Sequence, residues 1–310
     1  MLKATELEEG IDLILFRPFA FVLVKIFQPT AITPNQITLI SLLLGLVSGF
    51  CFWQGTATWV LVGAIFLFWT NVFDCADGML ARVRGTSSVI GYILDGMVDY
   101  ITHIVVYVSI LHGLSVVTQR PGFIWGIGIP AGLSFAWWCA MVDRFRNQWQ
   151  DKVYNKRTDP EEEVRELREI SAGWRAEGSH PGQRMLIACY TFYVSLWYTG
   201  AVHSKPIECN GSLKEKWIEL RRPITRMAIF MGPSMHLFLI IVAGVSNRLL
   251  WYIWFSLVFG TLWGLLVLAL KYRAELLLRV EKAKDNTNDD KAPEGYSAGG
   301  GSGNPAATSD

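Results

Sequence analysis

The sequence DCADGMLARVRGTSSVIGYILDGMVDY, residues 74–100, decides both the fold and the site. Four aspartates lie within 26 residues of this stretch, and apolar sequence long enough to span a membrane flanks them. They are Asp74, Asp77, Asp95 and Asp99. An ionisable side chain in a membrane span costs roughly 3 kcal/mol or more unless it is paired, hydrated or bound to metal. Arg82 supplies one positive charge, and Mg²⁺ or Mn²⁺, which prefer carboxylate oxygens, would balance the rest.

The spacing of the four aspartates predicts a single site. If both flanks are helical, Asp74 and Asp77 share one helix face, because they are three residues apart. Asp95 and Asp99, four residues apart, share a face of the next helix. Residues 84–87 predict the turn between the helices, which would place Asp77 opposite Asp95 and Asp74 opposite Asp99. Small residues on this surface would let a ligand or the opposing backbone approach closely. They are Gly78, Ala81 and Gly91.

The fixed residues read Asp-x2-Asp-Gly-x2-Ala-Arg-x8-Gly-x3-Asp-x3-Asp from Asp74 to Asp99. At every fixed position this pattern resembles the signature of the CDP-alcohol phosphotransferase (CDP-alcohol phosphatidyltransferase) family of integral membrane enzymes. Eight fixed residues over 26 positions are far more specific than a lone glycine motif. The structural alternative, a packed helix pair with ion pairs, would leave three of the four carboxylates without a cation.

The resemblance implies a reaction in which a CDP-linked alcohol gives its substituted phosphate to a second alcohol and CMP leaves. It assigns metal binding to Asp74, Asp77 and Asp95, with two Mg²⁺ or Mn²⁺ ions per site. It also makes Asp99 the base that takes the proton of the acceptor hydroxyl and a further metal contact. The matched positions that line the cytidine nucleotide are Gly78, Ala81 and Arg82.

Composition is that of a polytopic membrane protein. Of 310 residues, 51% are hydrophobic and 13% aromatic, and the mean hydropathy is +0.29. The net charge of +1 gives no indication of a nucleic-acid partner. We therefore predict an all-α bundle of about six membrane-spanning helices. The predicted spans are residues 35–54, 57–83, 88–116, 122–146, 224–246 and 249–272.

The N-terminal region precedes these spans. Residues 10–28 are apolar but interrupted by charges and a proline, which favours a helix lying along the membrane interface. Thr33 and Pro34 fit the N-cap and first position of the first span. The Pro-Asn-x-x-Thr pattern also resembles the nucleotide-proximal start of the first membrane helix in the family, so Asn35 and Thr38 either contact substrate or serve in capping. The acidic first ten residues do not resemble a signal peptide.

The second half of the chain leaves the number of spans open. Residues 185–202 are long enough for a seventh span. A seventh span, however, would place the basic residues between positions 205 and 226, and the basic stretch 271–284, outside the cytoplasm, against the preference of Lys and Arg for the cytoplasmic side. We predict instead an interfacial or re-entrant helix, which keeps both termini and the active site in the cytoplasm, as expected for a bacterial inner-membrane protein. The predicted membrane domain covers residues 1–284, with a charged cytoplasmic insertion at 147–184 and a disordered tail at 285–310.

Several assignments stay open on sequence grounds. The donor is either CDP-diacylglycerol, with a small polar alcohol as acceptor, or a CDP-amino alcohol, with a diacylglycerol-like lipid as acceptor. His103 and His236 are either structural hydrogen-bonding residues or near substrate, and Arg144 and Arg146 either contact substrate or anchor the membrane interface. A homodimer is expected from the resemblance alone. The competing class is a transporter or channel, which would spread its acidic residues through the membrane depth.

Overall fold

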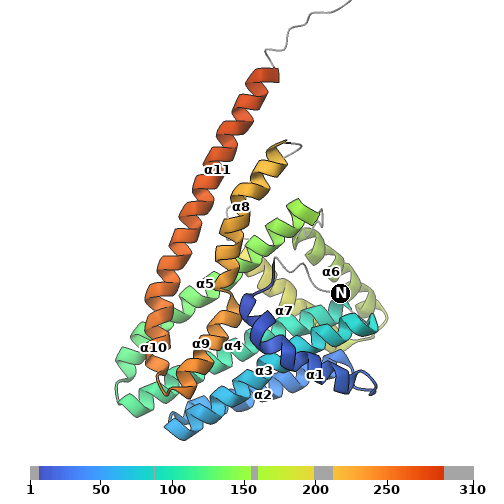
Figure 1. Ribbon diagram of the computed structural model, residues 1–310. Coiled ribbons are helices and arrows are strands. Elements are labelled where there is room, and N and C mark those ends of the chain that lie inside the picture. Colours follow the sequence, from blue (N-terminus) through green and yellow to red (C-terminus); the bar gives the residue numbers. More distant parts are fainter. Residues whose placement is uncertain (1–6, 87, 155–159, 199–211, 290–310) are drawn as a thin grey trace, which may run out of the picture.

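The computed structural model describes residues 7–86, 88–154, 160–198 and 212–289, and within these ranges the chain forms helices and no strand (Figure 1). The elements before residue 120 are the π-helical turn η2 (Asp12–Phe16), α1 (Arg17–Phe27), α2 (Pro34–Gln54), α3 (Ala57–Arg84) and α4 (Val89–Thr118). The middle elements are α5 (Pro121–Tyr154), α6 (Pro160–Ala176) and α7 (Pro181–Tyr198). The last are α8 (Ser212–Phe230), α9 (Pro233–Val245), α10 (Leu249–Trp254), the π-helical turn η3 (Phe255–Gly260) and α11 (Thr261–Asp289).

Six helical segments are long and apolar enough to cross a membrane, which confirms the predicted all-α bundle with six spans. Helix α7, which contains most of the predicted interfacial segment 185–202, is not among these six in the described part of the chain. Residues 199–202 lie outside the described residues. The spans are Pro34–Gln54, Ala57–Arg84, Ile90–Thr118, Pro121–Tyr154, Leu213–Val245 and Leu249–Lys282.

The start of α2 follows the sequence prediction. The Thr33 side chain accepts a hydrogen bond from the Gln36 backbone N–H at 3.3 Å, and the Gln36 side chain accepts one from the Thr33 N–H at 2.9 Å. This reciprocal capping box, followed by Pro34, satisfies backbone donors that a helix start leaves unpaired. Helix α3, which carries Asp74 and Asp77, ends at Gly85. This glycine has a φ of 66°, a left-handed conformation that glycine adopts without strain.

Helices α5, α8 and α11 extend well beyond the predicted spans. Helix α8 begins at Ser212, whereas the fifth span was predicted from residue 224. Helix α5 continues to Tyr154, eight residues past the predicted boundary at 146, because charged residues end an apolar stretch without ending a helix. The predicted insertion at 147–184 therefore begins inside α5. Helix α11 runs to Asp289, so the predicted disordered tail begins at least five residues too early. Residues 290–310, the rest of that tail, lie outside the described part of the chain.

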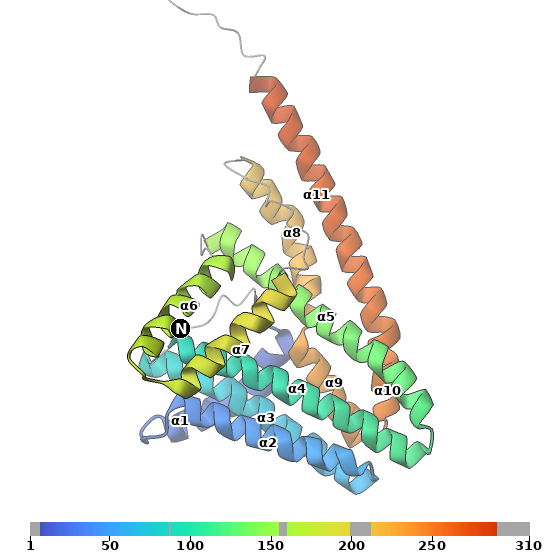
Figure 2. The same ribbon diagram turned by 180° about the vertical axis from the view of Figure 1, so that it is seen from behind.

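The fifth span is broken at Gly232 and Pro233. Helix α8 ends at Phe230, and α9 begins at Pro233, which lacks the N–H needed to continue the helix. The sixth span is continuous through the π-helical turn η3, which joins α10 to α11. Helices α8 and α11 pack together and extend side by side beyond the rest of the bundle (Figures 1 and 2).

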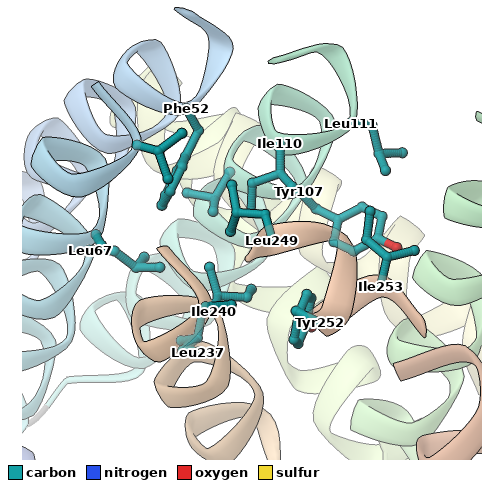
Figure 3. Close-up of a cluster of buried hydrophobic side chains, with 14 of the residues drawn as sticks. Phe52, Leu67, Tyr107, Ile110, Leu111, Leu237, Ile240, Leu249, Tyr252 and Ile253 are labelled. Atoms are coloured by element: carbon teal, nitrogen blue, oxygen red, sulfur yellow. The ribbon is translucent and has the colours of Figure 1, made fainter. Parts of the chain in front are cut away.

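The largest packed core lies where α2, α3, α4 and the helices after residue 233 converge (Figure 3). Phe52, Ile110 and Tyr252 are fully or almost fully buried there. Between α2 and α4, a side chain at Gly113 would put its Cβ 2.2 Å from the Phe52 carbonyl oxygen. Small residues at such contacts let membrane helices approach closely, which increases their van der Waals contact.

The outer surface of the bundle is apolar. Large hydrophobic side chains on several spans are exposed, for example Leu43 at 61% and Leu133 at 67%. A soluble monomer rarely exposes contiguous apolar area on this scale, whereas lipid tails accommodate it. Together with the six apolar helices, this makes the chain an integral membrane protein.

Helix α1 packs along the motif helix α3 (Figure 1). Its buried residues Ala20 and Val24 form one cluster with residues of α3 such as Ala76 and Leu80. The loop that follows α1 is held by Arg84, whose guanidinium donates to the carbonyls of Phe27 at 2.7 Å and Thr30 at 2.8 Å, and to that of Ile32. The N-terminal region is thereby fixed beside the aspartate-bearing helices.

On the opposite side, α6 and α7 pair with each other and cover α4 (Figure 2). Ile93 of α4 is buried in one cluster with Leu167 of α6 and Ile187 of α7. The charged sequence around residue 165 forms the amphipathic helix α6.

Candidate active site

Three aspartates converge between α3 and α4. Asp74, near the end of α3, and Asp95 and Asp99, on the first half of α4, each offer a carboxylate oxygen within 4.8 Å of the others. Oxygens on opposite sides of one Mg²⁺ ion lie about 4.2 Å apart, so the cluster needs little movement to hold a divalent ion. The helical spacing and the turn at Gly85 produce this convergence, as predicted from the sequence.

The remaining aspartate of the motif, Asp77, is not part of this group of three. It is only 4% exposed, and its Oδ2 accepts a hydrogen bond from the Thr38 hydroxyl of α2. Thr38 is also buried, at 3% exposure, and its hydroxyl lies 3.2 Å from the carbonyl of Pro34. The structure thus brings three of the four aspartates together and places the fourth one helical turn along α3, held by α2. A metal contact of Asp77 stays a prediction.

The chemistry of the cluster fits a divalent metal. Among the described residues, Asp74 Oδ1 is a buried side-chain oxygen with no hydrogen-bond partner. Leaving a buried acceptor unsatisfied costs about 1–3 kcal/mol, and more when the group is charged. An oxygen-binding cation between Asp74, Asp95 and Asp99 would remove this cost and balance the local negative charge.

The small residues of the motif lie at the end of α3 and the start of α4. A Cβ at Gly78 would lie 3.3 Å from Arg82 Nη1, so the Arg82 guanidinium lies against the glycine. A Cβ at Gly91 would lie 3.1 Å from Asn35 Oδ1, which places the Asn35 amide beside α4. Asn35 and Thr38, predicted from the start of α2, therefore both lie next to motif residues. Ala81, the remaining predicted nucleotide contact, lies in the last turn of α3.

A cavity of about 240 Å³ adjoins the three aspartates. It is bounded by the N-terminal segment, α3, α4, α5 and the start of α9. The lining residues are Leu7, Glu8, Glu9, Asp12, Arg17, Asn71, Asp74, Asp95, Asp99, His103, Arg146, Gln150, Pro233, Ser234 and Leu237.

The N-terminal wall of this cavity was not predicted from the sequence. Glu9 is 2% exposed; its Oε1 accepts a hydrogen bond from Arg146 at 2.8 Å and its Oε2 one from the Met235 N–H at 3.1 Å. Burial raises the pKa of Glu9 to about 7, and Arg146 opposes this shift. Burial also raises the pKa of Asp12, whose Oδ2 accepts a hydrogen bond from Ser234 at 3.0 Å. The only sequence signal was the acidic composition of the first ten residues.

The sequence did not decide the roles of two histidines and two arginines, and the structure separates these four residues into two groups. His103 and Arg146 line the cavity, whereas His236 and Arg144 are absent from its described lining. His236 is 1% exposed, and its Nδ1 lies 3.2 Å from the Tyr252 hydroxyl. That contact favours the structural interpretation of His236.

Part of the chain matches a known protein family. A family model described as CDP-alcohol phosphatidyltransferase matches residues 31–148, the segment from α2 through most of α5. No curated protein matches the chain. The matched segment contains all eight fixed residues of the motif and the three-aspartate cluster. The family consists of transferases of phosphate-containing groups that act in phospholipid synthesis with a CDP-alcohol donor and an alcohol acceptor. Over residues 31–148, the chain is thus similar to the CDP-alcohol phosphatidyltransferase family.

Proposed function

We propose that this protein is a divalent-metal-dependent enzyme that transfers a substituted phosphate from a CDP-alcohol to an acceptor alcohol and releases CMP. The observation that carries the proposal is the convergence of Asp74, Asp95 and Asp99 within 4.8 Å beside a cavity. Bound Mg²⁺ or Mn²⁺, in two positions per site, would neutralise the diphosphate of the donor and the departing CMP. Asp74, Asp77, Asp95 and Asp99 would hold these ions.

The acceptor hydroxyl would lose its proton to Asp99 in this proposal. The acceptor oxygen then forms a bond to the β-phosphorus of the donor, and the bond from that phosphorus to the bridging oxygen breaks. CMP leaves with the bridging oxygen, and Asp99 passes the proton to water. Asp99 lines the cavity, so an acceptor held there would lie within its reach.

The nucleotide would lie at the end of the cluster where α2, α3 and α4 approach one another. Gly78, Ala81 and Arg82 would line the cytidine moiety, and Asn35 would contact it from α2. The contact of Arg82 with Gly78 supports this placement, because a side chain at position 78 would crowd the guanidinium. Thr38 would act through Asp77, whose carboxylate it contacts.

The positions of the acidic residues do not favour an ion pathway. The motif carboxylates gather at the end of α3 and the first half of α4, and the other acidic residues of the cavity come from the N-terminal segment. A conduction path would need ionisable residues through the membrane depth. We place the site on the cytoplasmic face of a bacterial inner membrane because of the basic residues around the motif turn, Arg82 and Arg84.

The testing experiment is CMP release by detergent-purified protein with Mg²⁺ or Mn²⁺. CDP-diacylglycerol, CDP-choline and CDP-ethanolamine are crossed with small polar alcohols, phosphorylated alcohols and dioctanoylglycerol. Metal-dependent release with one pair is expected, and that pair decides between the two donor classes. Absence of both CMP binding and metal binding would refute the proposal. Size measurement of the same sample tests the expected homodimer.

A further inference from the structure

The cavity beside Asp99 lies at the end of the aspartate cluster that is farther from the proposed nucleotide site. Asn71 of α3 lies about one helical turn before Asp74, and His103 of α4 about one turn beyond Asp99, and both line the cavity. The residues of α3 proposed to contact the cytidine follow Asp77, and they are absent from the described lining. The cavity is therefore positioned to hold the acceptor alcohol rather than the nucleotide.

The cavity is small and its lining is polar. Its volume is about 240 Å³, and the apolar residues of its described lining are Leu7, Pro233 and Leu237. Each of the other lining residues carries a charged or hydrogen-bonding side chain. Acyl chains placed against these groups would remove water from them without replacing its hydrogen bonds. A small polar alcohol matches such a lining better than a diacylglycerol does.

Three side chains of the lining each present a buried atom that finds no hydrogen-bond partner within the described part of the chain. Two of these atoms are acceptors. Glu8 Oε2 belongs to a side chain that is 4% exposed and whose Oε1 accepts a hydrogen bond from Arg17 at 2.7 Å. The His103 ring hydrogen-bonds the backbone of Asp99, so its unpartnered Nε2 is an acceptor. The third atom, Arg146 Nε, is a donor.

These three atoms are separate from the proposed metal ligands. Asp74 Oδ1 is also buried and unpartnered, but it belongs to the cluster whose oxygens lie within 4.8 Å of one another. Among the described residues, neither His103 nor Glu8 is part of that cluster. They are therefore available to a substrate, which would have to offer donors to Glu8 and His103 and an acceptor to Arg146.

We infer that the acceptor is a small polar alcohol with at least one O–H or N–H group besides the attacking hydroxyl, and that the diacylglycerol is carried by the donor. The inference rests on the proposed function, because it names the class of substrate that reaches Asp99. The further groups of the alcohol donate to Glu8 Oε2 and His103 Nε2, and one of its oxygens accepts from Arg146 Nε. Phosphorylated and uncharged alcohols both belong to this class, since Arg146 and the bound metal ions would attract a phosphate group.

Diacylglycerol does not meet these requirements as an acceptor. It has one hydroxyl group, whose proton goes to Asp99 in the proposed reaction, and its ester groups can only accept hydrogen bonds. Glu8 Oε2 and His103 Nε2 would then stay buried without a donor, which weakens binding. With CDP-diacylglycerol as donor, the oxygen of the small alcohol bonds to the β-phosphorus, and CMP leaves with the bridging oxygen.

Steady-state kinetics of CMP release by the detergent-purified full-length chain test the inference, once binding of CMP and Mg²⁺ has been shown. One arm offers CDP-dioctanoylglycerol with glycerol, inositol, serine, glycerol 3-phosphate or inositol 1-phosphate. The other arm offers CDP-choline or CDP-ethanolamine with dioctanoylglycerol. At least one small alcohol is expected to give a kcat/KM that is about tenfold or more above that of the second arm.

His103→Asn tests the subsite itself. Asparagine keeps a donor near the position of Nδ1 but has no acceptor at the position of Nε2. The KM for the preferred alcohol is expected to rise about tenfold, while the KM for CDP-dioctanoylglycerol stays unchanged. The matched control is His112→Asn, farther along α4 and outside the described lining, which is expected to leave both values unchanged. An unchanged KM for the alcohol in His103→Asn would overturn the assignment of His103 to the subsite.

The outcomes separate this inference from the proposed function. A higher kcat/KM with dioctanoylglycerol as acceptor would overturn the inference and leave the proposed function intact. Release in neither arm, by protein that binds CMP and Mg²⁺, would also overturn the inference. Absence of both CMP binding and metal binding would instead refute the proposed function. The comparison of the two arms uses wild-type protein, so it decides the matter even if His103→Asn fails to fold.

Discussion

Arg146 and Glu9, 137 residues apart in the chain, form an ion pair at 2.8 Å that joins the end of α5 to the N-terminal segment. Glu9 is 2% exposed and Arg146 24% exposed, so solvent screens this pair only partly. Both residues line the cavity that Asp99 also lines. The N-terminal segment is thus part of the site, although it precedes the segment that matches the family.

Removing the cation of this pair should destabilise the protein. Arg146→Gln leaves the buried Glu9 carboxylate without its charged partner, and we expect a loss of about 1.5–3 kcal/mol at pH 8, where Glu9 is ionised. The matched control is Arg165→Gln, which removes an exposed ion pair with Glu162 and should cost less than about 1 kcal/mol. Unfolding in detergent measures both. Equal effects of the two substitutions would show that the buried pair does not stabilise the fold.

Glu9 should also give the fold a defined pH dependence. Burial raises its pKa from 4.5 in the unfolded chain to about 7, so the folded protein binds more protons between these values. The contribution of Glu9 to stability is therefore present below about pH 4.5 and decreases as the pH rises to about 7, by up to about 3 kcal/mol. The groups that face it are Arg146, Asp12 and the Met235 N–H, of which Arg146 opposes and Asp12 reinforces the shift.

Glu9→Gln removes this titration while keeping a side chain of similar shape. The unfolding midpoint of the variant, relative to wild type, is expected to rise between pH 5 and pH 8. A difference that stays constant across this range would show that Glu9 does not titrate there.

The Thr38 hydroxyl should matter through Asp77. Thr38→Val keeps the shape of the side chain but leaves Asp77 Oδ2 without its hydrogen bond. If Asp77 contacts metal, removing such an outer partner should weaken Mn²⁺ binding about 10–100-fold. Thr38→Ser retains the hydroxyl and should keep an affinity close to that of wild type. Calorimetric titration with Mn²⁺ separates the two cases, and wild-type affinity in Thr38→Val would show that this contact does not orient a ligand.

The close approach of α2 and α4 depends on Gly113. A Cβ there would lie 2.2 Å from the backbone oxygen of Phe52, so Gly113→Ala must push the helices apart and should cost about 1–3 kcal/mol. At Gly126 of α5, a Cβ would meet no atom of the described residues within 4 Å, so Gly126→Ala should be neutral or slightly stabilising. Thermal unfolding compares the two variants. A stable Gly113→Ala protein would mean that this contact can relax.

Local patterns account for what the sequence predicted. The apolar stretches indicated the six spans, and Thr33 and Pro34 indicated the start of α2. The aspartate spacing indicated the convergence of Asp74 with α4. Each of these depends on residues close together in the sequence.

Long-range packing accounts for what the sequence did not show. The pairing of Glu9 with Arg146 and the placement of Glu8 in the cavity leave no trace in periodicity, because the partners lie on separate elements. Helices α5 and α11 also exceed the predicted spans, since helix propensity continues where hydropathy ends.

CMP release by wild-type and Asp99→Asn protein, with Mg²⁺ or Mn²⁺ and the donor and acceptor that wild type uses, tests most directly whether Asp99 is the catalytic base. CMP binding is measured on the same preparations. We expect metal-dependent release by wild type, loss of turnover in Asp99→Asn, and CMP binding that persists in the variant. Wild-type turnover in Asp99→Asn would contradict the role of Asp99 as the base that accepts the proton of the acceptor hydroxyl.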